Sequence, residues 1–79
     1  MDHTNSISLT ELLVDHYATI SALNIGISET TRLVSLGFTP GAEVSMTQNY
    51  GYGPLIVTVR GTLVALGRVE AAKIFVQRS

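Results

Sequence analysis

The residues best suited to bind a metal ion gather in one short stretch near the N-terminus. This stretch contains Glu11, Asp15 and His16, whose carboxylate and imidazole groups are ligands that first-row transition metals accept. The spacing of the three residues matches no recognised ligand motif, and a turn is expected at Val14-Asp15-His16. The other histidine, His3, lies in the polar start of the chain. We therefore predict that the protein holds no metal ion or cofactor of its own, with Glu11, Asp15 and His16 as the only ligand candidates.

No group of residues in the sequence forms a recognisable catalytic set. The chain has no cysteine and only two histidines, so a thiol nucleophile is excluded and few general bases are available. No serine or aspartate pattern places a nucleophile beside either histidine. The glycine-rich segment Gly51-Tyr52-Gly53 lacks the Lys-Ser/Thr ending and the strand-loop-helix context of a phosphate-binding loop. The sequence therefore does not predict an enzyme.

The charged residues are few and balanced. Lysines and arginines number five, aspartates and glutamates number six, and the formal net charge is −1. Binding to nucleic acid by counterion release needs a basic face, and a polybasic membrane anchor needs clustered cations. No apolar stretch reaches the ~20 residues of a membrane-spanning helix, and the acidic, polar start is unlike a secretory signal. We expect no nucleic-acid partner, no direct membrane insertion and a cytoplasmic location.

Two tyrosines and two aliphatic residues are candidates for contact with a partner protein. Tyr50 and Tyr52 lie in a glycine-rich loop, and tyrosine is enriched at interfaces because it combines a large apolar area with a polar tip. The alternative is that both rings fold back over the end of the barrel. Ile56 and Leu63 are expected on the outer faces of neighbouring strands. There they would form an exposed apolar strip for a partner or a second copy, unless the N-terminal helical turn covers them.

Two arginines complete the candidate set. Arg32 and Arg60 would suit an acidic partner or a phosphate, because a guanidinium group forms forked hydrogen bonds. The alternative is an ordinary surface ion pair of little energetic weight. Glu29 lies three residues before Arg32 on the same predicted helical face, which favours that alternative. The predicted partner-binding residues are therefore Arg32, Tyr50, Tyr52, Ile56, Arg60 and Leu63.

Alternating apolar and polar residues predict five strands separated by short turns. Ser8 is expected to cap a short helical turn, and Ser28 a second helix that ends at Gly37. Short strands between Gly and Pro turns are typical of an antiparallel barrel, whose closure would remove exposed sheet edges. The sequence predicts a mainly β fold: a five-stranded antiparallel barrel with one or two short helices.

Residues 1–79 are predicted to form a single domain in which residues 1–7 are disordered. The predicted strands cover residues 17–23, 42–47, 55–60, 63–67 and 73–76.

Three motifs resemble those of a known family. The segment Arg32–Gly41 resembles the signature of FeoA domains, with its Arg-Leu pair, Leu-Gly-Phe helix end and Thr-Pro-Gly turn. Val59-Arg60-Gly61 and Arg68-Val69-Glu70-Ala71 are similar to later motifs of the family, and the resemblance runs from Leu9 to Val76. It implies a single FeoA-type domain folded as an SH3-like small barrel, with a helix inserted after the first long strand. It also implies a cytoplasmic role beside FeoB, the ferrous iron permease, which carries a GTP-hydrolysing domain.

The chain departs from the family pattern in its turns and in two strand positions. Val14-Asp15 stands where the family often has a Pro-Gly turn, although Asp tolerates turn geometry. Leu63 and Gly67 replace residues that are frequently charged in the family. These replacements weaken the case for docking by positive charge and favour an apolar contact.

The resemblance implies a small adaptor or regulatory protein of bacterial ferrous iron uptake that binds FeoB. The transport system, rather than this chain, would then handle Fe(II). The alternative is a metal-responsive regulatory domain, since similar barrels occur as the C-terminal domains of iron-dependent repressors. A third hypothesis is self-association, in which the apolar strip pairs copies of the chain into a homo-oligomer.

Overall fold

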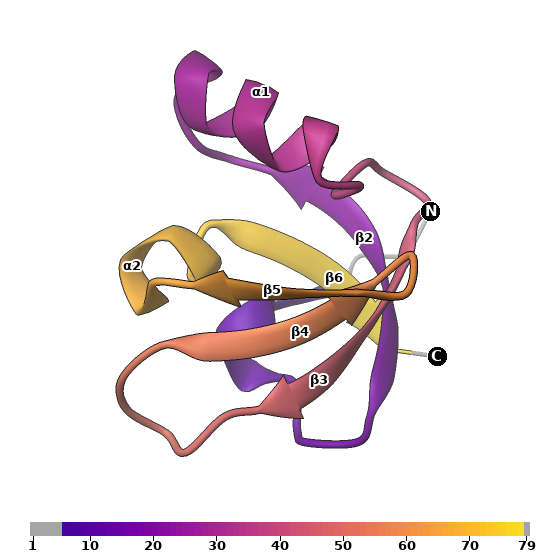
Figure 1. The fold of residues 1–79 in the computed structure, drawn as a ribbon, viewed down its shortest axis with the longest axis vertical. Coiled ribbons are helices and arrows are strands. Elements are labelled where there is room, and N and C mark those ends of the chain that lie inside the picture. The colour runs from indigo at the N-terminus through magenta and orange to yellow at the C-terminus, as the bar shows by residue number, and fades with distance from the viewer. Residues whose placement is uncertain (1–5, 79) are drawn as a thin grey trace.

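The computed structural model describes residues 6–78, which form one strongly curved antiparallel sheet and two short helices (Figure 1). The sheet has six strands in the order β1-β6-β2-β3-β4-β5. The mainly β antiparallel fold with short helices is confirmed, while the predicted number of five strands is wrong. The elements in chain order are β1 (Ser6–Ser8), the 3₁₀ turn η1 (Leu9–Glu11), β2 (Tyr17–Leu23), α1 (Ile27–Ser35), β3 (Glu43–Gln48), β4 (Leu55–Val59), β5 (Thr62–Leu66), α2 (Arg68–Ala71) and β6 (Ile74–Arg78).

The additional strand is β1, at the N-terminal end of the described residues. It pairs antiparallel with β6, and Ser6 lies opposite Gln77 and Ile7 opposite Val76. The disorder predicted for residues 1–7 therefore does not extend to residues 6 and 7, while residues 1–5, including His3, lie outside the described residues. The backbone of this segment gains its hydrogen bonds from a strand about 70 positions away, so no local pattern could reveal it.

The core follows from the alternation of apolar and polar residues along the strands. In β4 the burial alternates at every position, and Leu55, Val57 and Val59 are inside. In β5 the side chains of Val64 and Leu66 are buried, while Leu63 is exposed. Sixteen hydrophobic residues, drawn from the strands, η1 and both helices, form one buried cluster. No polar or charged side chain is buried within residues 6–78.

Helix α1 begins earlier than predicted and makes little contact with the barrel. Its N-cap residue is Gly26, which has no side chain to accept a hydrogen bond, and Ser28 lies inside the first turn. Of its nine residues only Leu33 is buried. The helix lies outside the curve of the sheet, at one end of the molecule (Figure 1). Its attachment therefore depends on Leu33 and on the residues that follow the helix.

The C-terminal end of α1 has the geometry predicted for Gly37. The amide of Phe38 donates to the carbonyl of Leu33 at 2.9 Å, and the amide of Gly37 donates to the carbonyl of Val34 at 3.0 Å. These are the two hydrogen bonds of a Schellman motif, which needs a left-handed residue after the helix. Gly37 has φ of +107°, and the fully buried Phe38 follows it into the core.

Alanine at position 37 is expected to destabilise the domain more than alanine at position 41. A Cβ atom at Gly37 would lie 2.8 Å from Cδ of Arg60, whereas a Cβ at Gly41 meets no atom within 4 Å. Both glycines have positive φ, so both substitutions cost backbone strain of about 1–3 kcal/mol. Urea unfolding should show the larger loss for Gly37→Ala, and equal losses would mean that Arg60 moves aside freely.

The barrel is not closed by hydrogen bonds. In the sheet order given above, β1 and β5 are the end strands, and each has a single hydrogen-bonded neighbour. The closure expected to remove every sheet edge is therefore absent in residues 6–78. Both end strands contact the same core cluster: Val64 and Leu66 of β5 belong to it, and Ile7 of β1 packs against it. None of the helices in residues 6–78 is long and apolar enough to cross a lipid bilayer.

Candidate partner-binding surface

The tyrosine loop, residues 49–54, joins β3 to β4 and extends away from the barrel. The side chains of Tyr50 and Tyr52 are 68% and 74% exposed. Their ring centroids are 6.3 Å apart and the planes are tilted by 38°. The alternative in which both rings fold back over the barrel end is therefore wrong. Two exposed rings side by side offer a partner a large apolar area with two hydroxyl groups.

The side chain of Asn49 ties the start of the tyrosine loop to the N-terminal segment. Its Nδ2 atom donates to the backbone carbonyls of Thr10 at 3.0 Å and Leu12 at 3.2 Å. Its Oδ1 atom accepts a hydrogen bond from the amide of Gly51 at 3.0 Å. Both polar atoms of the Asn49 side chain are therefore hydrogen-bonded. Through its nitrogen, Asn49 joins the loop to η1 and to Leu12, the residue after η1.

Arg68, the first residue of α2, holds the same loop from the other side. Its Nη2 atom donates to Oδ1 of Asn49 at 2.8 Å, and its Nε atom donates to the carbonyl of Gly53 at 3.1 Å. One half-buried guanidinium group therefore contacts both ends of the tyrosine loop. Sequence reasoning missed the roles of Asn49 and Arg68, because the two residues are 19 positions apart and belong to different elements.

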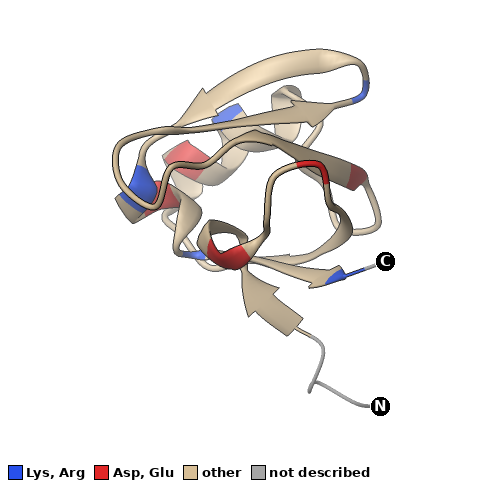
Figure 2. Cartoon of the chain, turned by 90° about the horizontal axis from the view of Figure 1, so that it is seen from below, with Lys and Arg blue, Asp and Glu red and all other residues tan. Residues whose placement is uncertain are grey.

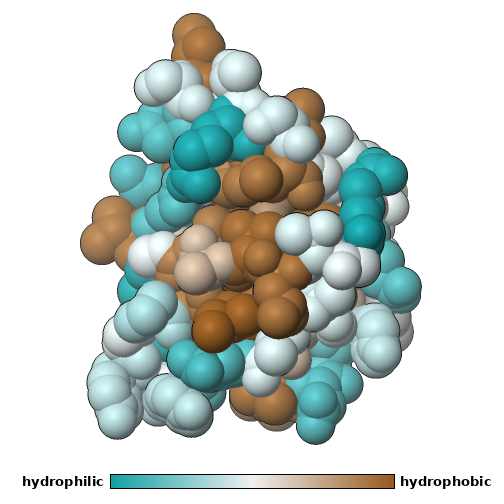
Figure 3. Space-filling model, in the orientation of Figure 1, coloured by the Kyte–Doolittle hydropathy of each residue, from teal (hydrophilic) through white to brown (hydrophobic). Residues whose placement is uncertain are grey.

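The predicted apolar strip of Ile56 and Leu63 is present, although its two residues differ in exposure. Ile56 and Leu63 lie on the outer face of β4 and β5, where Ile56 pairs with Ala65 and Thr58 pairs with Leu63. Leu63 is 65% exposed and Ile56 is half-buried. Figure 3 shows a continuous hydrophobic area near the middle of the molecule in the orientation of Figure 1. The N-terminal helical turn does not cover Leu63, since the side chain of Leu63 remains exposed.

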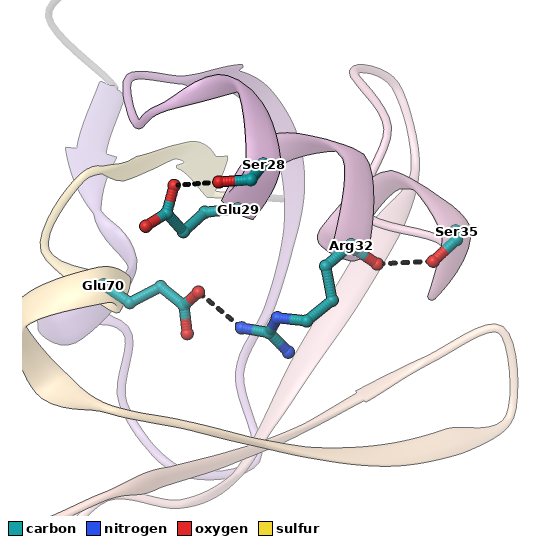
Figure 4. Close-up of polar contacts among 5 residues, drawn as sticks. All are labelled: Ser28, Glu29, Arg32, Ser35 and Glu70. Atoms are coloured by element: carbon teal, nitrogen blue, oxygen red, sulfur yellow. Dashed lines mark hydrogen bonds and ion pairs between the residues drawn. The ribbon is translucent and has the colours of Figure 1, made fainter.

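Arg32 forms a surface ion pair, but with a different partner from the one predicted. Its guanidinium group contacts the carboxylate of Glu70 and so links α1 to α2, while Glu29 accepts a hydrogen bond from Ser28 at 3.4 Å (Figure 4). The side chain of Arg32 is 51% exposed and that of Glu70 is 19% exposed. An ion pair with this exposure is worth up to about 1 kcal/mol. Arg32 is therefore engaged in joining the two helices.

Arg60 lies in the two-residue turn between β4 and β5. Arg60 and Gly61 both have positive φ, +53° and +78°, as a type I′ hairpin turn requires. The stem of Arg60 packs against Gly37, and its Nη2 atom donates to Oγ1 of Thr39 at 3.4 Å. The residue also lines an open pocket of about 480 Å³, together with Tyr17 and Glu43. Tyr17 is 55% exposed, and sequence reasoning gave it no role beyond starting a strand.

The side chains of Glu11, Asp15 and His16, the candidate metal ligands of the sequence, are all exposed. No group of three or more His, Cys, Asp or Glu residues within residues 6–78 is placed to hold a metal ion. Asp15 has φ of +70°, which fits the predicted turn. Figure 2 shows acidic and basic positions scattered over the described part of the chain, without a basic face.

The fold and this surface define a small barrel module with exposed aromatic and aliphatic side chains. The family model for the FeoA domain matches residues 7–78. The chain belongs to the FeoA family, a family of ferrous iron transport, and the resemblance drawn from the sequence is confirmed.

Individual relatives agree with the family match. A protein of Methanocaldococcus jannaschii, described as a candidate Fe(2+) transport protein A, is 33% identical over 58 residues, which is 73% of this chain and 70% of that protein. The solution structure of FeoA from Chlorobium tepidum has a TM-score of 0.85 at 26% identity and covers 91% of this chain and 70% of that one. The crystal structure of Stenotrophomonas maltophilia FeoA complexed with zinc, described as an SH3 domain protein, has a TM-score of 0.77 at 33% identity and covers 90% of this chain and 89% of that one. The SH3-like fold class is therefore confirmed.

The same fold occurs as part of longer regulatory proteins. The crystal structure of IdeR from T. acidophilum has a TM-score of 0.83 at 21% identity. The match covers all of this chain but only 37% of that one. At this level of identity the likeness concerns the fold alone.

Proposed function

We propose that this protein is a cytoplasmic, non-catalytic binding module of ferrous iron uptake that docks on the cytoplasmic domain of the FeoB permease. Membership of the FeoA family supports the link to ferrous iron transport. The observation that carries the docking is the exposure of Tyr50 and Tyr52 on a loop that is tied at both ends. Aromatic side chains of this kind supply much of the binding energy in protein interfaces.

The docking surface in this proposal is apolar and aromatic rather than charged. Arg32 is paired with Glu70, and Arg60 packs over Gly37, so neither guanidinium group is the main anchor. Leu63 and Ile56 provide a secondary apolar contact on the outer face of β4 and β5. The protein would then act by contact with the permease, and Fe(II) would be the cargo of the permease rather than a ligand of this chain.

Calorimetric titration of the purified chain into the soluble cytoplasmic domain of FeoB tests this proposal. We expect saturable binding with a Kd of about micromolar order, the range of transient interfaces of small area. The titration should be repeated without nucleotide, with GDP and with a non-hydrolysable GTP analogue, because the family resemblance implies that the permease carries a GTP-hydrolysing domain. No heat of binding in any of the three states, and none to the full-length permease in detergent, would contradict the proposal.

The metal-responsive alternative predicts a different result. The likeness to IdeR supports the barrel shape of such a domain but not its chemistry. An anaerobic Fe(II) titration that saturates in the intact chain, and fails after Glu11→Gln with His16→Gln, would favour that alternative. Light scattering of the same samples over a concentration range would detect self-association.

A further inference from the structure

We propose that Arg68 and Asn49 are positioning residues for the tyrosine loop, which they hold in a binding-ready conformation before the partner arrives. The inference rests on the proposed function, because it assumes that Tyr50 and Tyr52 contact the partner. Arg68 and Asn49 would not touch the partner themselves, and each has a distinct physical task.

The first task, performed by Asn49, is to join the loop to the barrel. A primary amide has two donor hydrogens and one acceptor oxygen. In Asn49 the nitrogen donates to the carbonyls of Thr10 and Leu12, and the oxygen accepts from the amide of Gly51 and from Arg68. Both atoms of this half-buried side chain are therefore committed to fixing the loop.

The second task, performed by Arg68, is to join the two ends of the loop to each other. The planar guanidinium group presents several donors in fixed directions. Two of them reach Oδ1 of Asn49 and the carbonyl of Gly53, at opposite ends of the segment that carries the tyrosines. A lysine ammonium carries its donor hydrogens on one nitrogen and lacks the planar fork of donors on separate nitrogens, so we expect the two simultaneous contacts to depend on arginine.

The guanidinium group of Arg68 reaches from α2, a single turn of four residues, to the tyrosine loop. There it makes both of the hydrogen bonds that its side chain forms within residues 6–78.

The loop needs this support because its own backbone is permissive. Gly51 and Gly53 have φ of +85° and +72°, and a Cβ atom at either would meet no atom within 4 Å. Glycine has the largest conformational freedom to lose on ordering. A loop ordered in advance avoids that loss when the partner binds, which raises affinity without any new contact.

The test compares Arg68→Ala and Arg68→Lys with Lys73→Ala, which removes the same charge from the exposed residue between α2 and β6. The readouts are the Kd for the FeoB cytoplasmic domain, the hydrogen-exchange rate of the Gly51 amide and that of the core amide of Val57. Both Arg68 variants should bind about tenfold more weakly, the scale expected when a few groups must be ordered on binding. In both, the Gly51 amide should exchange faster while the Val57 amide is unchanged, and Lys73→Ala should match the unmodified chain.

Each other result overturns a defined part of the inference. Unchanged affinity in Arg68→Ala, with binding lost in the double variant Tyr50→Ala and Tyr52→Ala, rejects the positioning role and leaves the proposed function intact. Full affinity in Arg68→Lys rejects the need for two simultaneous contacts. If the unmodified chain does not bind, the proposed function fails, and unchanged exchange of the Gly51 amide in Arg68→Ala would separately reject the ordering of the loop.

Discussion

Replacement of Phe38 by alanine is expected to destabilise the domain strongly and to lower its Tm. Phe38 is among the largest fully buried side chains, and with Leu33 it attaches α1 to the barrel. Truncation of a buried phenylalanine costs about 3–5 kcal/mol. A chain of 79 residues has a free energy of unfolding of roughly 4–12 kcal/mol. The substitution therefore removes a large share of the total, and thermal unfolding followed by circular dichroism should show a fall in Tm of at least about 12 °C.

The other phenylalanine, Phe75, provides a matched control for this experiment. It lies in β6, opposite Ser8 of β1 and Ala22 of β2, and is half-buried. Phe75→Ala deletes the same atoms from a less enclosed site, so a loss of about 1–2 kcal/mol is expected. A stability loss for Phe38→Ala no larger than that for Phe75→Ala would show that the segment after α1 is not a major anchor.

The double variant Tyr50→Ala and Tyr52→Ala is expected to lose about 100-fold in affinity for the FeoB cytoplasmic domain. The two rings are the most exposed aromatic groups of residues 6–78. Truncation of an interface tyrosine costs about 1–2 kcal/mol, so two such losses amount to about 100-fold in affinity. Because these rings contribute little to the core, the Tm should change by no more than about 4 °C. Surface plasmon resonance with the immobilised permease domain would measure the affinity.

Tyr17→Ala is the natural control, since Tyr17 is also exposed but lies on β2 beside the open pocket that Arg60 lines. It should retain the affinity of the unmodified chain. Equal losses for Tyr17→Ala and the double variant would move the docking surface from the tyrosine loop to the pocket. Retention of full affinity by the double variant would reject the loop as the anchor, while Leu63→Ser would then test the strip on β4 and β5.

Local patterns in the sequence predict most of the elements of this fold. The alternation at Leu55, Val57 and Val59 identifies β4 and its inner face because side chains of a strand point alternately to opposite sides. Gly37 marks the end of α1 because the left-handed conformation there favours glycine. These signals act over a few residues, so a single sequence reveals them.

Interactions between distant segments are the part that local patterns did not reveal. The partner of Arg32 is Glu70, 38 positions away, rather than the nearby Glu29. The pairing of β1 with β6 and the hydrogen bond between Asn49 and Arg68 depend likewise on which segments the fold brings together. Leu13 follows the N-terminal turn and is 63% exposed, whereas Leu9 and Leu12 are fully buried.

The place of β6 in the sheet has a consequence for how the chain acquires its structure during synthesis. Although β6 comes last among the strands, it lies between β1 and β2 and hydrogen-bonds to both. A ribosome-bound chain that lacks this strand therefore has β1 without a neighbour and β2 with one side open. The consecutive strands β3, β4 and β5 can pair as soon as they emerge, because their contacts are local. Native assembly of the N-terminal half must wait until translation has passed Arg78.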